Sequence, residues 1–232
     1  MRFFSTLMND IRYQVKYGFY LVYALISTLY IVALLFCPLE YRKIAASIII
    51  LTDPALLGTF FIGGIWLLEK REGLHKFWII SPLRSLEYIM SKAVSLSIIS
   101  TLVAGLIALI GVREAVNYLL LLVGVFLGSV VFTVIGLILA TYARSVNQYM
   151  IIVTIPTTLL VTPAILTAFG ISHIIFDILP GTAMWRLIAV SLDIDTTSVL
   201  WIYSVLILWL VAVFYLACKS IPTAMQVEGG GE

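Results

Sequence analysis

Few residues of this chain have side chains that could carry out chemistry: two histidines, one acid within an apolar run and one long charged stretch. The histidines, His75 and His173, are predicted on opposite faces of a membrane, so they cannot form one site. The sequence contains no HExxH, no GxSxG, no paired aspartates at one depth, and no G-x-x-x-x-G-K-S/T loop that would cradle ATP. We therefore expect no catalytic, cofactor-binding or metal site in this chain. If the function of the chain consumes energy, another chain must supply it.

Asp53 is the one acid that lies well inside an apolar run, on the outer third of a predicted membrane span. An ionisable residue at that depth is a functional candidate by default. Asp53 also precedes Pro54, so its carboxylate could instead cap the helix that resumes after the proline. We favour the capping interpretation here and keep the functional one open.

The long charged stretch runs from Glu69 to Lys92, between two apolar segments. It could be a solvated turn on the positive side of a membrane. A plain turn, however, does not need the apolar cluster that a short helix would carry here, namely Leu74, Phe77, Trp78, Ile79 and Ile80. Aromatic side chains amid charges are typical of a helix that docks into a groove of a soluble partner, so we favour docking. Ser81-Pro82 then ends this helix.

The composition identifies the kind of molecule that must position these residues. Of 232 residues, 62% are hydrophobic and 11% charged, and the mean hydropathy is +1.12, whereas soluble domains are about half apolar and about a quarter charged. This is an integral membrane protein. A spanning helix needs roughly 20 apolar residues, so the length allows about six spans and no soluble catalytic domain. The net charge of +2 argues against a nucleic-acid partner.

Apolar runs and turns predict an all-α integral membrane protein with six transmembrane helices, at about 18–36, 44–68, 86–110, 116–142, 149–169 and 199–218. The docking helix would occupy about 69–80, and residues 219–232 would form a disordered cytoplasmic tail. The fourth span carries small residues at multiples of four, which is typical of close helix packing: Gly124, Gly128, Gly136 and Ala140. The fifth span contains Pro156 and Pro163 on one face of a kinked helix, with threonine hydroxyls that could satisfy freed carbonyls or line a polar path.

Two segments lie outside these spans. Residues 1–17 place apolar side chains on one helical face, which predicts an amphipathic interfacial helix; a solvated extension is the alternative. This start lacks the features of a removable signal, so the first span is expected to stay. Residues 171–192 are apolar but interrupted by Asp177, Pro180-Gly181 and Arg186. Each half is too short to span, so we expect two short helices that re-enter from the outer side, with a seventh span as the alternative.

Counting Lys and Arg predicts the orientation, because these residues concentrate on the cytoplasmic side. The side with the amphipathic start, the charged stretch, the Arg144 turn and the tail holds ten of them, and the other side holds four. Both termini are therefore predicted in the cytoplasm. Cys37 and Cys218 fall on opposite faces in this arrangement, which makes a disulfide between them implausible and offers no metal site.

The charged stretch resembles the membrane subunits of ABC-2 type exporters. Their hallmark is a span ending in Glu, a charged cluster with Gly, an apolar pair, then Thr/Ser-Pro-Leu, and later Glu and Lys. This chain has these residues in the same order: Glu69, Lys70, Glu72, Gly73, Ser81, Pro82, Leu83, Arg84, Glu87, Tyr88, Ser91 and Lys92. It departs after Gly73, where Leu74 and His75 replace the usual Thr and Leu. The opening DIRYQVKYGFY also looks like members named fluoroquinolone export permeases, and the six-span layout is similar over nearly the whole chain.

The resemblance implies a half-size permease of an ATP-driven exporter with a type V exporter-like fold. Two copies, or this chain with a similar one, would pair in the membrane among lipids, and each would dock a separate ATP-binding subunit that holds ATP and Mg. The coupling helix that contacts this subunit would be formed by Glu69, Lys70, Arg71, Glu72, Gly73, Leu74, Phe77 and Trp78, and ended by Ser81 and Pro82. The path between subunits would be lined by Asp53, Gly58, Gly63, Gly64, Thr157, Thr158 and Thr162, and closed on the outer side by Asp177, Pro180 and Gly181.

We therefore expect an exporter permease in the cell's inner membrane that is not itself an enzyme and that moves an amphipathic or hydrophobic substrate outward, such as a drug-like molecule, a lipid or a peptide. The main rival is an ion- or proton-coupled secondary transporter. That rival predicts several intramembrane acids or an inverted repeat, whereas the sequence shows one acid and no repeat. A membrane-embedded enzyme acting on lipid is disfavoured by the separated histidines.

Overall fold

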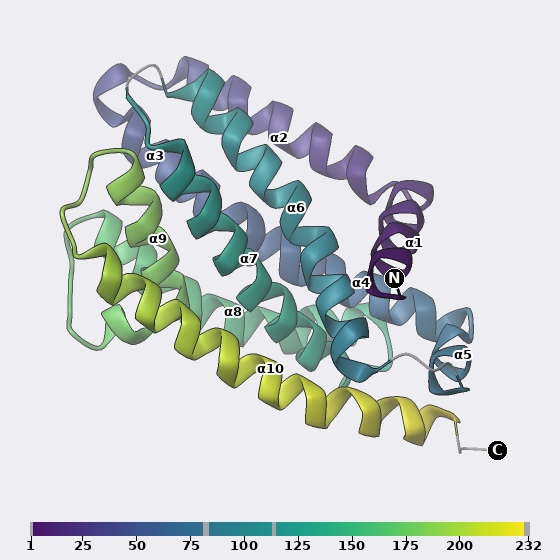
Figure 1. The fold of residues 1–232 in the computed structure, drawn as a ribbon. Helices are drawn as coiled ribbons and strands as arrows, with labels where there is room; N and C mark the ends of the chain where they lie inside the picture. Colours follow the sequence, from purple (N-terminus) through teal and green to yellow (C-terminus); the bar gives the residue numbers. More distant parts are fainter. Residues whose placement is uncertain (1, 81–83, 113–114, 230–232) are drawn as a thin grey trace.

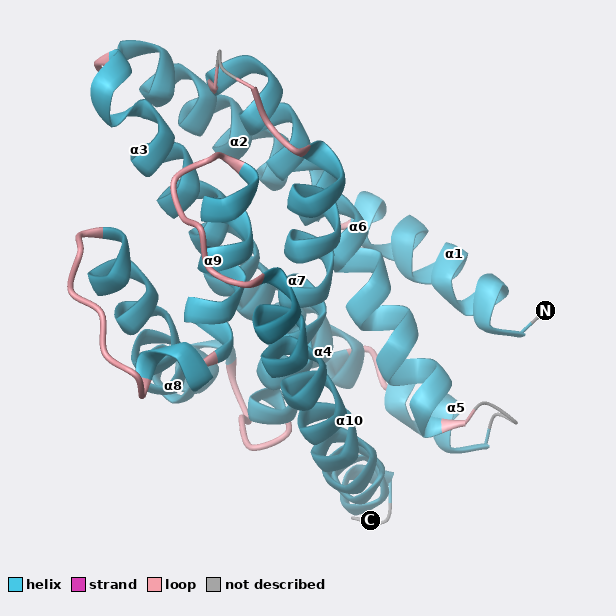
Figure 2. Ribbon diagram, turned by 60° about the vertical axis from the view of Figure 1, so that its left-hand side comes forward, coloured by secondary structure: helices cyan, strands magenta, loops and turns pink. Residues whose placement is uncertain are grey.

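The computed structural model describes residues 2–80, 84–112 and 115–229, and this part of the chain is helical, without strands (Figure 2). Ser81 and Pro82 lie outside it. The elements are α1 (Arg2–Lys16), α2 (Phe19–Phe36), α3 (Leu39–Thr52), the π-helix η1 (Asp53–Gly58), α4 (Thr59–Arg71), α5 (Leu74–Ile80), α6 (Ser85–Gly111), α7 (Tyr118–Ala140), α8 (Val146–Ala168), the 3-10 turn η2 (Phe176–Ile178), α9 (Pro180–Ser191) and α10 (Val199–Gly229).

The prediction of six membrane-spanning helices is confirmed for the described residues. Six continuous helices are long and apolar enough to cross a bilayer: α2, α6, α7, α8, α10, and the 33-residue run of α3, η1 and α4. The second span therefore begins at Leu39, earlier than expected, and Asp53 lies near its middle rather than in its outer third. The protein is a multi-pass membrane protein.

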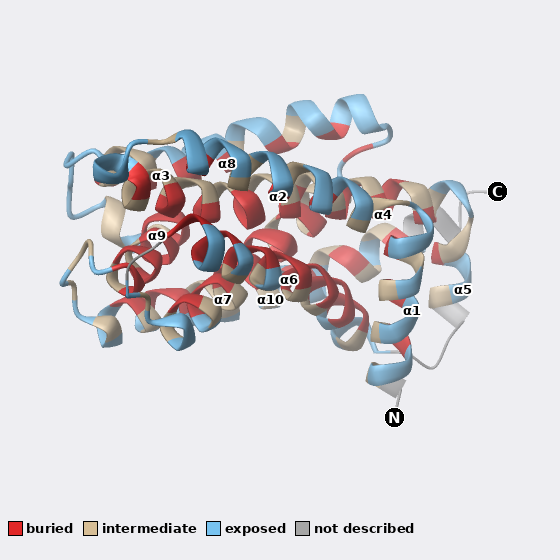
Figure 3. Ribbon diagram, turned by 90° about the horizontal axis from the view of Figure 1, so that it is seen from above, coloured by how far each residue is buried: buried red, intermediate tan, exposed pale blue. Residues whose placement is uncertain are grey.

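Helices α6 and α7 are among the most buried spans, and α2, α8 and α10 are the least buried. Figure 3 shows the largely exposed α2 beside the largely buried α6. Glycines on α7 allow its neighbours to come close, as the small-residue pattern predicted. A Cβ at Gly128 would lie 2.4 Å from the sulfur of Met184 on α9, and one at Gly136 would lie 3.0 Å from the backbone of Thr59 on α4. These close approaches fix α9 and α4 against α7.

Charged segments lie at two opposite ends of the bundle, and the segments that the Lys and Arg count grouped together lie at the same end. Helix α1, helix α5 and the C-terminal end of α10 lie at one end of the molecule (Figure 1). Lys70, Arg144 and Lys219 line one surface depression at that end, and Lys43 and Asp193 line one at the opposite end. Which end faces the cytoplasm stays a prediction.

The expectation of a disordered tail from residue 219 is wrong over the described residues, because α10 continues to Gly229. The sequence there looks polar, yet Ile221 and Met225 are buried in a cluster that also includes Tyr88. These two apolar side chains, one helical turn apart, hold the end of α10 against the bundle even though Pro222 interrupts its backbone hydrogen bonds.

The segment at residues 171–192 does not form a seventh span. It contains the single turn η2 and then the 12-residue helix α9, which is too short to cross a bilayer. Pro180 does not interrupt a helix there but begins α9, at the position where its missing N–H costs nothing. Ten of the 12 residues of α9 are buried, so this helix is packed inside the bundle, at the end opposite α5.

Candidate functional site

Helix α1 turns a polar stripe, not an apolar one, toward the rest of the protein. Thr6, Asp10 and Gln14 recur every four residues and are buried against α6. Apolar side chains such as Phe4, 73% exposed, point away from the protein. An apolar outer face suits contact with lipid, although the interfacial position of α1 stays a prediction. The buried stripe means that α1 is anchored to the bundle by polar contacts.

A buried charged cluster joins α1, α4 and α6, and we call Asp10, Glu69, Tyr88, Ser91 and Lys92 the Lys92 cluster. The Lys92 ammonium lies 2.5 Å from an Asp10 carboxylate oxygen and forms a second ion pair with Glu69. Ser91 donates a hydrogen bond to Asp10, and Tyr88 donates one to Glu69 at 2.8 Å. All five side chains are buried. Three helices far apart in sequence are thus joined by one lysine.

The Lys92 cluster is a demanding arrangement in energetic terms. Each charge has lost its hydration, a cost that only close pairing and additional hydrogen bonds offset. Lys92 supplies that pairing for two carboxylates at once, and its ammonium also lies 5.4 Å from the centroid of the Tyr88 ring. A second polar contact reinforces the same junction, because Gln14 donates a 2.7 Å hydrogen bond to Ser95 of α6. Removing Lys92 would leave two buried carboxylates without a cation, because it is the counter-ion of both.

The turn from α4 into α5 lies directly beside this cluster. Gly73 has a φ of 71°, the left-handed conformation that ends helices at glycine, so the chain leaves α4 and starts α5 at once. Glu72 accepts hydrogen bonds from the phenols of Tyr13 and Tyr17. Burial and the bond to Glu72 raise the pKa of Tyr13, and the bond to Glu72 raises the pKa of Tyr17, so both phenols remain donors at neutral pH.

Helix α5 divides the aromatic pair that the sequence suggested. Phe77 is 65% exposed, whereas Trp78 turns inward and packs edge-on against Tyr88, with ring centroids 5.4 Å apart. His75 is buried against Trp66 of α4, with centroids 4.2 Å apart. Trp78 and His75 therefore fasten α5 to α6 and α4, and Phe77 is left as its outward apolar side chain.

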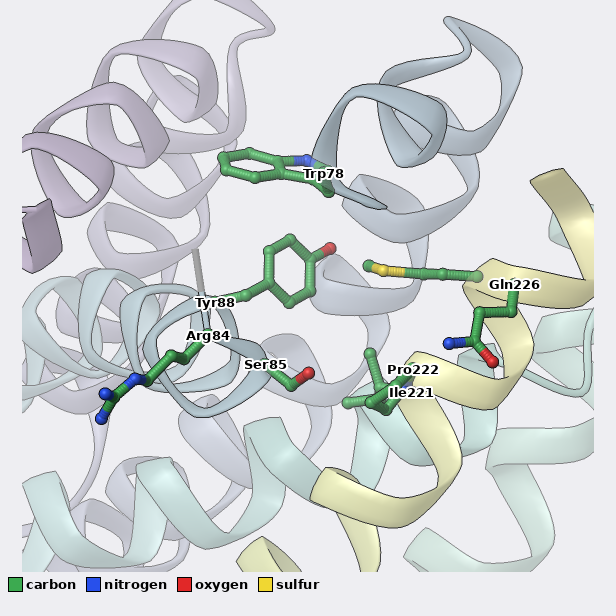
Figure 4. A pocket seen from close by; sticks show the side chains of 8 residues that line it. Trp78, Arg84, Ser85, Tyr88, Ile221, Pro222 and Gln226 are labelled. Atoms are coloured by element: carbon green, nitrogen blue, oxygen red, sulfur yellow. The ribbon is translucent and has the colours of Figure 1, made fainter. Parts of the chain in front are cut away.

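A cavity of about 140 Å³ lies between α5, the start of α6 and the end of α10. Figure 4 shows the rings of Trp78 and Tyr88 facing Ile221 and Pro222 across it. The indole N–H of Trp78 is buried and donates to none of the described residues. The C-terminal end of α10 thus lines this cavity together with α5, although a disordered tail was predicted there.

The other predicted coupling residues occupy different environments. Glu69 is buried in the Lys92 cluster, so it cannot contact a partner directly. Arg71 and Glu72 are exposed, and Lys70 and Leu74 are half-buried. Only part of the predicted coupling segment can therefore contact a partner. The exposed side chains, Phe77 and the charged residues near it, form the outward surface, and the buried side chains anchor α5 to the bundle.

The predicted path residues do not share one surface. Thr158 and Thr162 are exposed on the outer face of α8, while Thr157 on the same helix is buried. Gly58 and Gly63 lie inside the bundle. A Cβ at Gly63 would lie 2.0 Å from the Tyr149 ring, so this glycine serves packing in the conformation described.

Of the predicted outer gate residues, Asp177 pairs with Arg186 of α9, whereas Gly181 packs against α8. Its guanidinium forms ion pairs with Asp177 at 2.6 Å and with Asp195 at 3.1 Å, and it donates a hydrogen bond to the hydroxyl of Thr197. Gly181 contacts α8 so closely that a Cβ there would lie 2.1 Å from a backbone oxygen. The contacts of Arg186 fasten the loops on both sides of α9 to this helix.

Sequence reasoning missed the Lys92 cluster as a unit. It placed Glu69 and Lys92 in the charged stretch and residues 1–17 in a separate amphipathic helix, without pairing side chains of the two segments. One signal was available: Asp10 and Gln14 fall one helical turn apart, as do Ser91 and Ser95, which predicts two polar stripes able to face each other.

Within the described residues, no group of three or more His, Cys, Asp or Glu is placed to hold a metal ion. Six helices long and apolar enough to span a membrane, with the short helix α5 fastened to α4 and α6 beside a buried charged cluster, define a multi-pass membrane protein. The chain belongs to the fluoroquinolones export permease protein family, whose model matches residues 1–225.

Two relatives from Mycobacterium tuberculosis are similar to this chain. Both are called fluoroquinolones export permease protein, one from strain CDC 1551 / Oshkosh and one from strain ATCC 25618 / H37Rv. Each is 26% identical over 170 residues, which is 73% of this chain and 72% of the relative. The family and these relatives together identify an export permease.

Proposed function

We propose that this chain is the membrane subunit of an ATP-driven ABC exporter, located in the inner membrane with both termini in the cytoplasm. It pairs with a second permease copy or a similar chain, and each permease docks a separate ATP-binding subunit that supplies ATP and Mg. The pair moves an amphipathic or hydrophobic substrate outward by alternating access. The names of the relatives favour a drug-like aromatic substrate.

The observation that carries this proposal is the mounting of α5 on the Lys92 cluster. Helix α5 leaves α4 through Gly73, and Trp78 of α5 packs on Tyr88, which in turn donates a hydrogen bond to Glu69 of α4. A displacement of α5 by a partner therefore reaches two spanning helices through buried, directional contacts. An ordinary solvated turn would not need such a linkage.

The mechanism follows from the same contacts. When two ATP-binding subunits close on ATP, each carries its docked α5 with it. Because Lys92 holds Asp10 of α1 and Glu69 of α4 together on α6, the cytoplasmic ends of α1, α4 and α6 move as one unit. Interfaces of this kind repack between discrete arrangements rather than deforming gradually. The outer end around Arg186 would then open in response.

The charges around α5 indicate the chemistry of the partner surface. Exposed Arg71 and Lys76 flank Phe77, and Lys70, Arg144 and Lys219 line a neighbouring depression. We therefore expect a groove on the ATP-binding subunit with an apolar pocket for Phe77 and an acidic rim. Charges of opposite sign at the rim mainly set specificity and the association rate, while the buried aromatic side chain sets affinity.

Phe77→Ala is expected to weaken association with the ATP-binding subunit by roughly tenfold or more, because a central aromatic anchor contributes about 2 kcal/mol or more and each 1.4 kcal/mol is a factor of ten. Folding should be unchanged, since Phe77 is 65% exposed. The measurement is the dissociation constant between the purified permease in detergent and candidate ATP-binding subunits.

Phe36→Ala is the matched control, because Phe36 is 86% exposed and lies at the opposite end of α2 from α1. It should leave the dissociation constant unchanged. Equal binding by Phe77→Ala and wild type, with a partner that does bind wild type, would show that α5 is not the docking helix.

A further inference from the structure

Asp53 is a buried acid that the proposed docking mechanism does not use. It lies near the middle of the second span and is 1% exposed. Neither carboxylate oxygen accepts a hydrogen bond from any residue in the described part of the chain. The capping interpretation is therefore wrong, because a capping carboxylate would accept a backbone N–H of the first turn. The helix does not restart at Pro54; it passes through it.

The backbone at Asp53 has an unusual form. Asp53 is the first residue of η1, the π-helix that interrupts the second span. Pro54 cannot donate a backbone hydrogen bond to the carbonyls one turn before it, and the hydroxyl of Thr52 donates to one carbonyl of that turn, that of Ile49. Asp53 takes no part in this bond. Short π-helical turns occur frequently at functional sites, where they re-aim a side chain.

Among the residues that the structure describes, no cationic side chain bonds to the carboxylate of Asp53. The described helices α7 and α8, which pack against η1, contain no Lys, Arg, Asp or Glu. On α3 and α6 the charged residues lie within the first eight residues of the helix, and on α4 they lie within the last three. The phenols of Tyr23 and Tyr30 on α2 lie within electrostatic range of Asp53.

An ionised carboxylate without a partner inside a bilayer costs far more than one that holds a proton. From its burial, its two unpartnered oxygens and the lack of a facing cation, we propose that Asp53 is a proton-binding site: its carboxyl group holds a proton in this conformation and exchanges it with water when the bundle opens. The ligand is a proton, and when it passes to water Asp53 is left as a carboxylate that the same water hydrates.

Proton exchange at Asp53 needs water to reach its carboxyl group, because neither carboxyl oxygen is hydrogen-bonded to a described residue. Tyr23 of α2 is hydrogen-bonded instead to Ser100 of α6, with 2.9 Å between the two hydroxyl oxygens. Helix α2 is the least buried span, so it can separate from α6 at little cost in packing. Opening at this seam would admit water to Asp53. Coupling of that event to transport rests on the proposed exporter function, but proton binding itself does not.

The test is infrared spectroscopy of the full chain in vesicles of phosphatidylethanolamine and phosphatidylglycerol, without any ATP-binding subunit. We expect one C=O stretching band of a protonated carboxyl group at neutral pH, present in wild type and in Glu40→Gln, whose carboxylate is exposed. The band should vanish in Asp53→Asn, shift in D₂O and disappear reversibly at alkaline pH. Asp53→Glu should retain a shifted band, which gives a second readout should Asp53→Asn fold poorly.

Three results would overturn the proposal. If the spectrum of Asp53→Asn contained every carboxyl band of wild type, Asp53 would be ionised in wild type. A band that neither D₂O nor alkali alters would mean that the proton is sealed in the structure. A band that appears only after sodium is removed would mean that the carboxylate holds a metal cation. Failure of every ATP-binding subunit to bind the permease would contradict the exporter function instead and would leave these spectra unchanged.

Discussion

Replacing Lys92 with methionine is expected to destabilise the folded chain by about 3–5 kcal/mol, the usual cost of removing one partner from a buried ion pair. The methionine has a similar volume, so packing around it changes little. The loss arises because Asp10 and Glu69 remain buried beside each other without a cation. The measurement is the thermal or denaturant unfolding midpoint of the permease in detergent.

Lys219→Met provides the control for Lys92→Met, because it removes the same charge from an exposed position on α10. Its unfolding midpoint should match that of wild type. Adding Asp10→Asn and Glu69→Gln to Lys92→Met should recover most of the lost stability, since all three charges are then absent. Equal stability of Lys92→Met and Lys219→Met would rule out the Lys92 cluster as a structural junction.

Gly181→Ala is the second change with a large expected effect, because its Cβ would lie 2.1 Å from the carbonyl oxygen of Leu160 and 3.1 Å from the carbonyl carbon. Backbone atoms cannot rotate away as a side chain can, so α9 must move off α8. We expect a loss of about 1–3 kcal/mol, the range for overpacked sites, measured as a lower unfolding midpoint. Hydrogen exchange of α9 should also become faster.

Gly105→Ala is the comparison for Gly181→Ala. Its Cβ would lie 3.2 Å from the end of the Leu122 side chain, which can adjust, and alanine favours the helix over glycine. The unfolding midpoint should stay near that of wild type. If the unfolding midpoint of Gly181→Ala also stayed near that of wild type, α9 would not be tightly packed against α8.

The six spans, the short helix after the second span and the short segments before the last span were predictable because apolar runs and their interruptions are local properties of the sequence. Gly73 was predicted to lie in the coupling helix, and it forms the turn that starts α5. The family was recognisable for the same reason, since the residues from Glu69 to Lys92 occur in a recognisable order. Local patterns of this kind need no knowledge of tertiary contacts.

Other features could not be predicted because they depend on contacts across the bundle. Asp10 lies far along the chain from Lys92, and only the packing of α1 on α6 brings them together. Trp78 and Phe77 look equivalent in sequence, but the neighbouring Tyr88 draws one of them inward. The tail was judged by its polar residues, whereas two apolar side chains of α10 decide its structure.

Asp53 shows a third kind of limit. Its position before a proline favoured a helix cap, a local rule that fails here because the π-helix lets the chain continue without a break. Where a local rule fails in a well-packed structure, a functional constraint is a common reason. This position is therefore the one where sequence and structure together point to function most directly.

The most direct test of the central claim, that the Lys92 cluster transmits motion from α5 to the spans, is the transport achieved per ATP hydrolysed in vesicles containing the permease and its ATP-binding subunit. The variant to compare with wild type combines Asp10→Asn, Glu69→Gln and Lys92→Met, which keeps the outward surface of α5 unchanged. We predict that this variant binds the ATP-binding subunit with unchanged affinity but transports far less substrate per ATP. Equal transport per ATP in the variant and in wild type would contradict a transmitting role for the cluster.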